Sequence, residues 1–155
     1  MSIQEKVESL GYKWPAVAKP LAAYVPWVRA GDLLFVSGTV PVVDGKLAYL
    51  GKVTAELSEE KAAEAARQCA LNILAAVDSA VAEGEEVKRV VRVTGYIASS
   101  HNFTHQPQVM NGASDLFVAV FGEAGRHTRE AVGVAELPLG APVEVSAVFL
   151  VRKKE

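Results

Sequence analysis

Two charged residues near the C-terminus are the best candidates for chemistry in this sequence. Arg129 precedes the apolar, β-branched segment 131–137, and Glu144 is the second residue of a similar segment, 143–151. A guanidinium group binds a carboxylate through two parallel hydrogen bonds. A carboxylate on an apolar strand face has a raised pKa, which suits acid–base catalysis. The pair therefore predicts a site that binds a carboxylate and moves a proton, or a salt bridge between strands joined by the turn 138–142, or both.

Other arrangements of reactive residues have weaker support. His101 and His105 have the i, i+4 spacing of a metal pair, but they lie in a predicted loop without cysteines or clustered carboxylates, so we expect no metal site. Ser37 lacks the Gly-x-Ser-x-Gly pattern of a nucleophile elbow, and the segment around it does not end like a phosphate-binding loop. These patterns favour neither a serine hydrolase at Ser37 nor a nucleotide-binding protein.

The composition is that of a globular protein, with 50% hydrophobic and 22% charged residues in 155. We expect one domain over residues 1–155, in which an N-terminal helix and an extended lead-in occupy residues 1–20. The net charge of −2 gives no electrostatic reason to expect nucleic acid or an anionic membrane as partner. Without a signal-peptide pattern or an apolar run of about 20 residues, a cytoplasmic protein with no membrane span is expected.

The spacing of apolar residues predicts the elements that must position Arg129 and Glu144. Ser58 suits a helix N-cap, and Gly31 suits the turn of a hairpin. The predicted elements are a short helix (2–10), a hairpin (25–29 and 33–37), a small hairpin around 44–45, a helix from 58 to about 80, a strand (87–99), a helix (108–121) and two strands (131–137 and 143–151). The order β-β-α-β-α-β-β indicates an α+β fold in which both long helices pack on one face of a sheet.

The last predicted strand is apolar on both of its faces. Val148 and Leu150 share one face with Glu144, while the other face carries only apolar residues, namely Val143, Val145, Ala147, Phe149 and Val151. A single helix layer covers only one face of a sheet. A partner subunit is therefore expected to cover the other face.

Four segments resemble the RidA/YjgF family, formerly called the L-PSP endoribonuclease or translation-initiation-inhibitor group. The segment AGDLLFVSGTVP is similar to the family motif Gly-(Asn/Asp)-hydrophobic-Ser-Gly-Gln-(Ile/Val)-Pro, with Thr39 in place of glutamine. VVRVTGYI resembles the central strand of the family, and HTREAVGVAELP and APVEVSAV resemble its two C-terminal motifs. The loop 101–107 and the segment FGEAGRHTR resemble a longer-loop branch of this family.

The resemblance implies a chorismate-mutase-like fold, a homotrimer around a central barrel, and ligand clefts between subunits. It also implies hydrolysis of reactive enamines and imines, such as 2-aminoacrylate and 2-iminopropionate, to 2-oxoacids and ammonia. This chemistry requires neither a metal nor an organic cofactor, because the imine carbon is already electrophilic. The enzyme has to hold the substrate carboxylate and place a water molecule.

The resemblance also implies roles for individual residues. Arg129 matches the carboxylate-binding arginine of the family, and Glu144 matches the glutamate that positions the attacking water. The implied substrate-binding residues are Tyr24, Ser37, Gly38, Ser114, Arg129 and Ala131. Ser114 matches the position of a pocket asparagine, but Asn111 is the nearest asparagine, so both remain candidates.

This sequence also departs from the family pattern. Ala22 and Ala23 replace the Gly-Pro before Tyr24, and Ala131 replaces a cysteine found in some members. Near Arg129, three charged or titratable residues are expected to add charge beside the pocket: Glu123, Arg126 and His127.

Two other functions compete with imine hydrolysis. A trimer that binds small carboxylates without turnover, for example in regulation, would use Arg129 equally well. Ribonuclease activity, which the older family name suggests, is disfavoured by the slightly acidic charge balance and by the lack of a basic stripe with stacking aromatic residues.

Overall fold

The computed structural model describes residues 1–17, 19 and 22–155, and its helices and strands follow the predicted order. The elements are α1 (Ile3–Ser9), β1 (Trp27–Ala30), β2 (Leu33–Thr39), β3 (Val42–Val43), β4 (Lys46–Leu47), α2 (Glu59–Ala80), β5 (Glu85–Ala98), α3 (Gln106–Phe121), β6 (Thr128–Val134) and β7 (Val143–Lys153). Ala18 and Pro20 of the expected extended lead-in, and Leu21 after it, lie outside the described residues.

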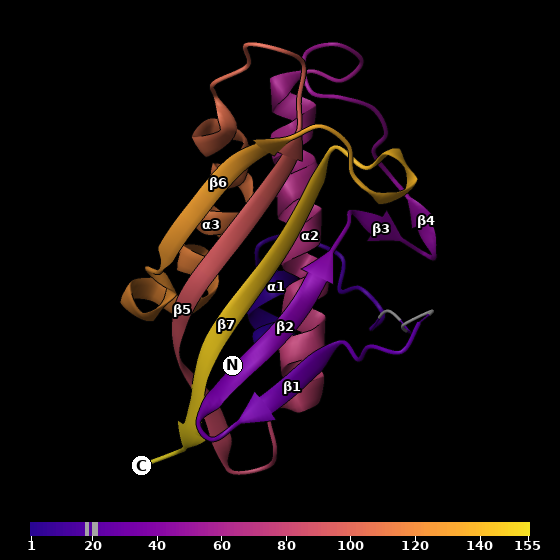
Figure 1. Ribbon diagram of the computed structural model, residues 1–155. Coiled ribbons are helices and arrows are strands. Elements are labelled where there is room, and N and C mark those ends of the chain that lie inside the picture. Colours follow the sequence, from indigo (N-terminus) through magenta and orange to yellow (C-terminus); the bar gives the residue numbers. More distant parts are fainter. Residues whose placement is uncertain (18, 20–21) are drawn as a thin grey trace.

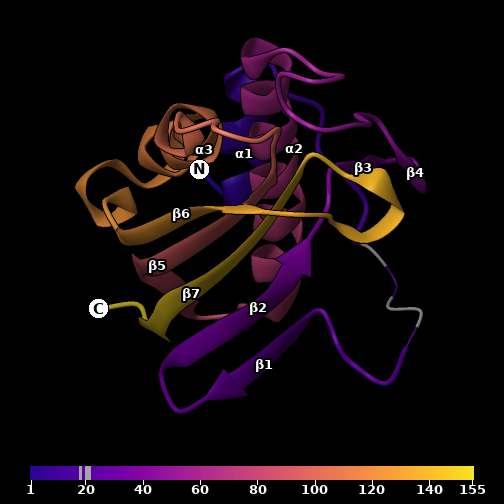
Figure 2. The same cartoon turned by 45° about the horizontal axis from the view of Figure 1, so that its top comes forward.

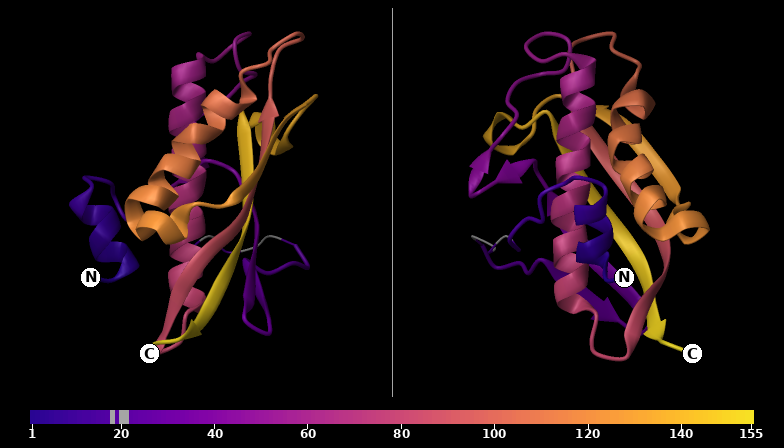
Figure 3. Two further views of the ribbon diagram at one scale, coloured as in Figure 1. Left: turned by 90° about the vertical axis from the view of Figure 1, so that its left-hand side faces the viewer. Right: turned by 180° about the vertical axis from the view of Figure 1, so that it is seen from behind.

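The main sheet has five strands in the order β1-β2-β7-β5-β6 (Figure 1). Helices α2 and α3 cover one face of this sheet, and no described element covers the opposite face (Figure 3, left). We call these the helix face and the open face. The predicted α+β fold with both long helices on one face is confirmed.

The helix layer is fixed by capping and by close packing. Ser58 caps α2 by accepting a hydrogen bond from the backbone N–H of Lys61 at 3.2 Å. A Cβ atom on Gly112 of α3 would lie 2.0 Å from the carbonyl oxygen of Ala63 in α2, so glycine allows the two helices to approach closely. The largest fully buried side chains between helices and sheet include Phe117, Phe149, Leu34, Ile73 and Leu74.

Strands β6 and β7 are consecutive in the chain but are not neighbours in the sheet. β5 lies between them, pairing in parallel with β6 and antiparallel with β7 (Figure 2). The sequence had offered a salt bridge between adjacent strands as one interpretation of Arg129 and Glu144. That interpretation is wrong, because a turn between consecutive strands does not by itself make them neighbours. β6 also begins at Thr128, so Arg129 lies inside the strand rather than before it.

The two faces of β7 differ in burial as its sequence predicts. Its wholly apolar set is buried beneath the helices, whereas Glu144, Val148 and Leu150 are half-buried on the open face. The open face also exposes apolar side chains: Val28 is 53%, Phe35 44% and Val132 44% accessible. Exposed apolar side chains on an uncovered sheet face are typical of a surface that is covered in an assembly.

Candidate functional site

Arg129 lies on the helix face of the edge strand β6, beneath α3. It pairs with the buried Val93 of β5, and directly paired strand residues share a face. Its Nη1 atom donates to Asn111 Oδ1 at 2.9 Å and to Ser114 Oγ at 3.1 Å. Both candidates for the asparagine position therefore contact Arg129, because α3 places residues three apart on the same side of the helix.

These contacts leave one edge of the guanidinium group available. The two Nη1 hydrogens are used by α3 side chains, while Nη2 donates only a long 3.5 Å bond to the carbonyl oxygen of Pro107. Among the described residues, Nε of Arg129 has no hydrogen-bond partner. The Nε–Nη2 edge has the geometry that binds both oxygens of a carboxylate. The helix thus orients the group mainly through Nη1 and contacts this edge only through the long bond to Pro107.

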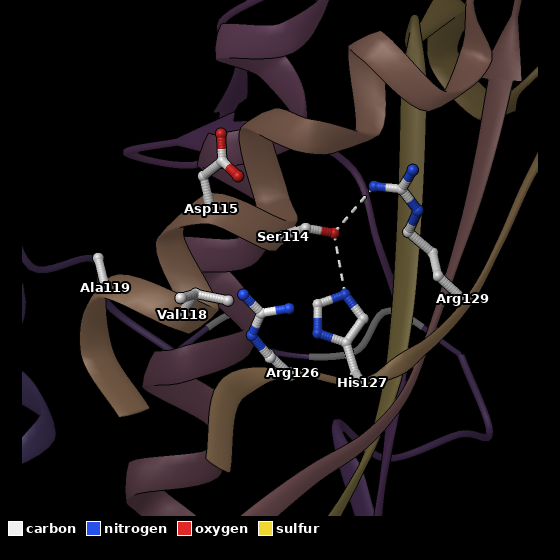
Figure 4. Close-up of a pocket in the computed structure, with 7 residues that line it drawn as sticks. All are labelled: Ser114, Asp115, Val118, Ala119, Arg126, His127 and Arg129. Carbon is white, nitrogen blue, oxygen red and sulfur yellow. Dashed lines mark hydrogen bonds between the residues drawn. The ribbon is translucent and has the colours of Figure 1, made fainter. Parts of the chain in front are cut away.

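His127 extends the hydrogen-bond network around Arg129. Its Nε2 atom lies 2.9 Å from Ser114 Oγ, and its Nδ1 atom lies 2.7 Å from the carbonyl oxygen of Gly125. In Figure 4 the side chains of Ser114, His127 and Arg129 point toward one another. Burial, and also the nearby charge of Arg129, lower the pKa of His127, although its hydrogen bond to Gly125 opposes this change.

An open pocket of about 610 Å³ lies beside this network. It is lined by Ser114, Asp115, Val118, Ala119, Arg126, His127 and Arg129 (Figure 4). The sequence predicts charge from His127 beside the pocket but not the hydrogen bond between His127 and Ser114. The two residues are 13 positions apart and share no motif, so only the packing of α3 against the β6 entrance brings them together.

Glu144 lies on the open face, on the opposite side of the sheet from Arg129. It pairs with Tyr96 of β5, next to the pair of Gly95 and Val145 that faces the helices. A Cβ atom on Gly38 would lie 3.0 Å from Oε2 of Glu144, so these two residues are in close proximity. Burial raises the pKa of Glu144 above its ordinary value, as its apolar strand face had predicted.

The remaining predicted site residues divide between the same two faces. Ala131 pairs with Gly95 on the helix face, near Arg129. Ser37 alternates with the buried Val36 on β2, and its hydroxyl donates to the carbonyl oxygen of Val25 at 2.6 Å. This bond fixes the segment after Tyr24, whose side chain is 55% accessible. One chain therefore carries two separate groups of candidates, one around Arg129 and one around Glu144.

The other histidines lie away from both groups. His105 Nδ1 is 3.1 Å from Glu59 Oε2, a contact between the α3 entrance and the first turn of α2. His101 is exposed in the preceding loop. Within the described part of the chain, no group of three or more His, Cys, Asp or Glu side chains is arranged to hold a metal ion.

The fold and the site define a mixed α+β protein with three α-helices in its described residues and a candidate anion-binding arginine beneath the second long helix. The pattern of the family described as "YjgF/chorismate mutase-like, putative endoribonuclease" matches residues 4–151. The chain belongs to this family. None of its described helices is long and apolar enough to cross a membrane.

Individual relatives agree with this membership. Protein TCP17 of Trypanosoma cruzi is 44% identical over 147 residues, covering 94% of this chain and 92% of that protein. A crystal structure of a protein of unknown function from Agrobacterium tumefaciens is 40% identical, with a TM-score of 0.87, covering 97% of this chain and 93% of that one. A 2-iminobutanoate/2-iminopropanoate deaminase of Dermatophagoides farinae is 27% identical over 137 residues, covering 88% of this chain and 92% of that protein.

Proposed function

We propose that this protein hydrolyses small 2-imino acids and their enamine tautomers to 2-oxoacids and ammonia. The observation that carries the proposal is the hydrogen bonding of Arg129. Its Nη1 is held by Asn111 and Ser114, while its Nε–Nη2 edge makes only the long bond from Nη2 to Pro107. A guanidinium group fixed in this way is pre-organised to bind a carboxylate. A deaminase of this substrate class among the relatives supports the proposal.

The two groups of candidates suggest that the site is shared between subunits. Arg129 and Glu144 lie on opposite faces of one sheet, so a small substrate cannot touch both within one chain. In a symmetric assembly, each open face would meet the β6 edge of another copy and combine the Glu144 group with that copy's Arg129 group. The exposed apolar residues of the open face support a homotrimer assembled in this manner.

The proposed reaction assigns one task to each group. Arg129 binds the carboxylate of the protonated imine and so orients its C=N bond. Glu144 accepts a proton from water as the water oxygen bonds to the imine carbon and the C=N π electrons move to nitrogen. A proton then returns to the nitrogen of the carbinolamine. The C–N bond breaks as the hydroxyl oxygen forms the C=O bond of the 2-oxoacid, and the hydroxyl proton passes to the departing ammonia. The raised pKa of Glu144 makes its carboxylate a better base than an exposed one.

The direct test is the release of ammonia from freshly generated 2-iminopropionate. An L-amino acid oxidase acting on alanine supplies the imine in the cuvette, and the rate of ammonia and pyruvate formation is measured with and without this protein. Acceleration that disappears in Arg129→Ala supports the proposal. Ammonia release at the spontaneous rate, with the protein correctly assembled, contradicts it.

A second candidate is a binding protein that retains the same carboxylate without turnover. The open edge of Arg129 favours this function equally, since holding a carboxylate requires no base. Calorimetric titration with pyruvate distinguishes the two candidates when it is combined with the ammonia assay. Binding without accelerated hydrolysis identifies the regulatory function.

A further inference from the structure

The hydrogen bond between Ser114 and His127 has no part in the proposed imine hydrolysis. Which of the two groups donates follows from the hydrogen bond that the other ring nitrogen, Nδ1, makes. The carbonyl oxygen of Gly125 can only accept, so Nδ1 of His127 carries the proton that it donates over 2.7 Å. In the neutral ring Nε2 is then an acceptor, and the Ser114 hydroxyl donates to it at 2.9 Å.

The surroundings of His127 keep the ring in this neutral form. The ring is half-buried against Phe117, with centroids 5.9 Å apart, and the charge of Arg129 lies beyond Ser114. Both features lower its pKa. The charged residues facing the pocket are Arg126, Arg129 and Asp115. Asp115 and Glu123, which pairs with Arg126, supply two carboxylates there, so the charge of Arg129 is the one that disfavours an imidazolium.

Arg129 completes the polarisation of the Ser114 hydroxyl. Its Nη1 atom donates to Ser114 Oγ at 3.1 Å, while the hydroxyl proton is directed at His127. A hydroxyl oxygen has two lone pairs, so one remains free for attack. A carbonyl oxygen that becomes negative beside Ser114 Oγ would be stabilised by the positive charge of the same guanidinium group.

The pocket also limits what kind of substrate can reach Ser114. Val118 and Ala119 of α3 form an apolar side, and Arg126 offers a second cation away from Arg129 (Figure 4). Arg126 is 72% accessible and is paired only with the exposed Glu123 at 3.4 Å, an arrangement that a ligand can displace. A short acyl chain that ends in a carboxylate fits this pocket: its acyl carbon would face Ser114, its methylene groups the apolar side, and its carboxylate Arg126.

We propose that Ser114 and His127 form a nucleophile–base pair that hydrolyses esters of small dicarboxylic acids, with Arg126 binding the free carboxylate. Ser114 Oγ bonds to the acyl carbon, its proton moves to Nε2 of His127, and the carbonyl π electrons move to oxygen. The C–O bond to the alcohol breaks, and His127 returns the proton to the alcohol. Water then repeats these steps on the acyl-serine, releasing the acid and restoring Ser114.

Covalent labelling tests the nucleophile directly, without any imine. Diisopropyl fluorophosphate reacts with an activated serine by forming an O–P bond and releasing fluoride. Peptide mass spectrometry of the whole assembled protein is expected to find the label on Ser114. His127→Gln is expected to reduce the labelling rate at least 100-fold, the lower range for loss of a general base. His105→Gln removes a histidine that bonds only Glu59, and labelling is expected to remain unchanged.

Hydrolysis of para-nitrophenyl esters tests the substrate class. The monoester of adipic acid is compared with the hexanoate ester, which has the same chain length without the carboxylate. We expect a higher kcat/KM for the adipate monoester, and Arg126→Gln is expected to lower that preference about tenfold, because the variant loses the charge-assisted hydrogen bond to the free carboxylate. The pH profile of wild-type labelling gives a readout that needs no variant: the rate falls with acid, with an apparent pKa below the ordinary value for histidine.

Labelling of Ser114 that depends on His127, together with the adipate preference, establishes the pair. The proposal is overturned if Ser114 stays unlabelled, if another residue takes the label, or if neither His127→Gln nor acidification slows the reaction. None of these results depends on whether the protein hydrolyses imines.

Discussion

At the scale of single residues, the function proposed for Arg129 depends on which of its donors are occupied. Asn111 and Ser114 hold Nη1, so the group cannot rotate away, and the remaining edge is presented at the surface of β6. A lysine at this position has one nitrogen. It cannot satisfy α3 and bind a carboxylate through two parallel bonds at the same time.

Arg129→Lys is therefore expected to lower kcat/KM for 2-iminopropionate about 10- to 100-fold, and Arg129→Ala by more, since a charge-assisted hydrogen bond contributes about 1.5–3 kcal/mol. Both variants should retain the wild-type thermal midpoint, because Arg129 is only half-buried. Arg152→Lys is the matched control, as Arg152 pairs with Asp32 far from the site. If Arg129→Ala unfolds the protein, the residue is structural.

Replacing Glu144 by glutamine is expected to change both turnover and the pH dependence of stability. Glu144→Gln keeps the shape of the side chain but removes the base, so turnover should fall about 10²- to 10⁴-fold while pyruvate still binds. Near-normal turnover in this variant would eliminate the catalytic role of Glu144.

The raised pKa of Glu144 also fixes the sign of a stability change. Below its ordinary pKa of 4.5 the carboxyl group is protonated in both the folded and the unfolded state, and burial carries no charge penalty. As the pH rises through the higher folded-state pKa, the unfolded state releases its proton more readily, so wild-type stability falls relative to Glu144→Gln. The difference in thermal midpoint between variant and wild type should thus grow as the pH rises from 4.5 toward the raised folded-state pKa. A constant difference would show that burial does not perturb this group.

At the scale of elements, α3 is the part that positions the Arg129 group. It supplies both contacts to Nη1, and its own position depends on the close approach of Gly112 to Ala63 of α2. The approach also explains why a glycine occurs in the middle of a helix, where it otherwise lowers helix stability.

Gly112→Ala is expected to destabilise the protein by about 1–3 kcal/mol, the typical cost of overpacking. The added Cβ would lie 2.0 Å from a backbone oxygen, so the helices must separate. This shift moves Asn111 and Ser114 away from Arg129, and turnover should fall with the thermal midpoint. Asp115→Ala, at an exposed position of the same helix, serves as the stability control. An unchanged midpoint would contradict the role of this helix contact.

At the scale of the whole molecule, the main question is how the open face of one copy meets the Arg129 group of another. The open face exposes Val28, Phe35 and Val132 on the same side of the sheet as Glu144. A homotrimer is the expected assembly, and light scattering should give three times the mass of one chain at micromolar concentration. Phe35→Asp places a charge in this apolar surface and is expected to yield single chains. A wild-type mass of one chain would contradict the assembly.

Complementation tests the shared site directly. Arg129→Ala and Glu144→Gln chains are each expected to be inactive alone, but each supplies the group that the other lacks. When the two are co-expressed in equal amounts, about a quarter of the sites in a cyclic trimer should contain both native residues, and activity should return to about that fraction. No recovery in mixed trimers would mean that both residues act within one chain.

The helices and strands, the buried face of the last strand and the two main site residues could be predicted from the sequence alone. The helix cap at Ser58, the turn at Gly31 and the alternation along residues 143–151 follow from local preferences, and they gave the correct elements and the correct buried face. The family motifs located Arg129 and Glu144 because these motifs are contiguous in the chain. The rise in the pKa of Glu144 was also predictable, since it depends on apolar neighbours in the same strand.

Only the tertiary structure decided how these residues relate in space. The insertion of β5 between β6 and β7 separates Arg129 from Glu144, and strand order depends on long-range pairing that local sequence does not encode. The same holds for the hydrogen bond between Ser114 and His127. It depends on the position of α3 above the start of β6, and Gly112 allows α3 to pack closely against α2 in that position. Periodicity reports which face of an element is buried, whereas the choice of neighbour depends on how whole elements pack.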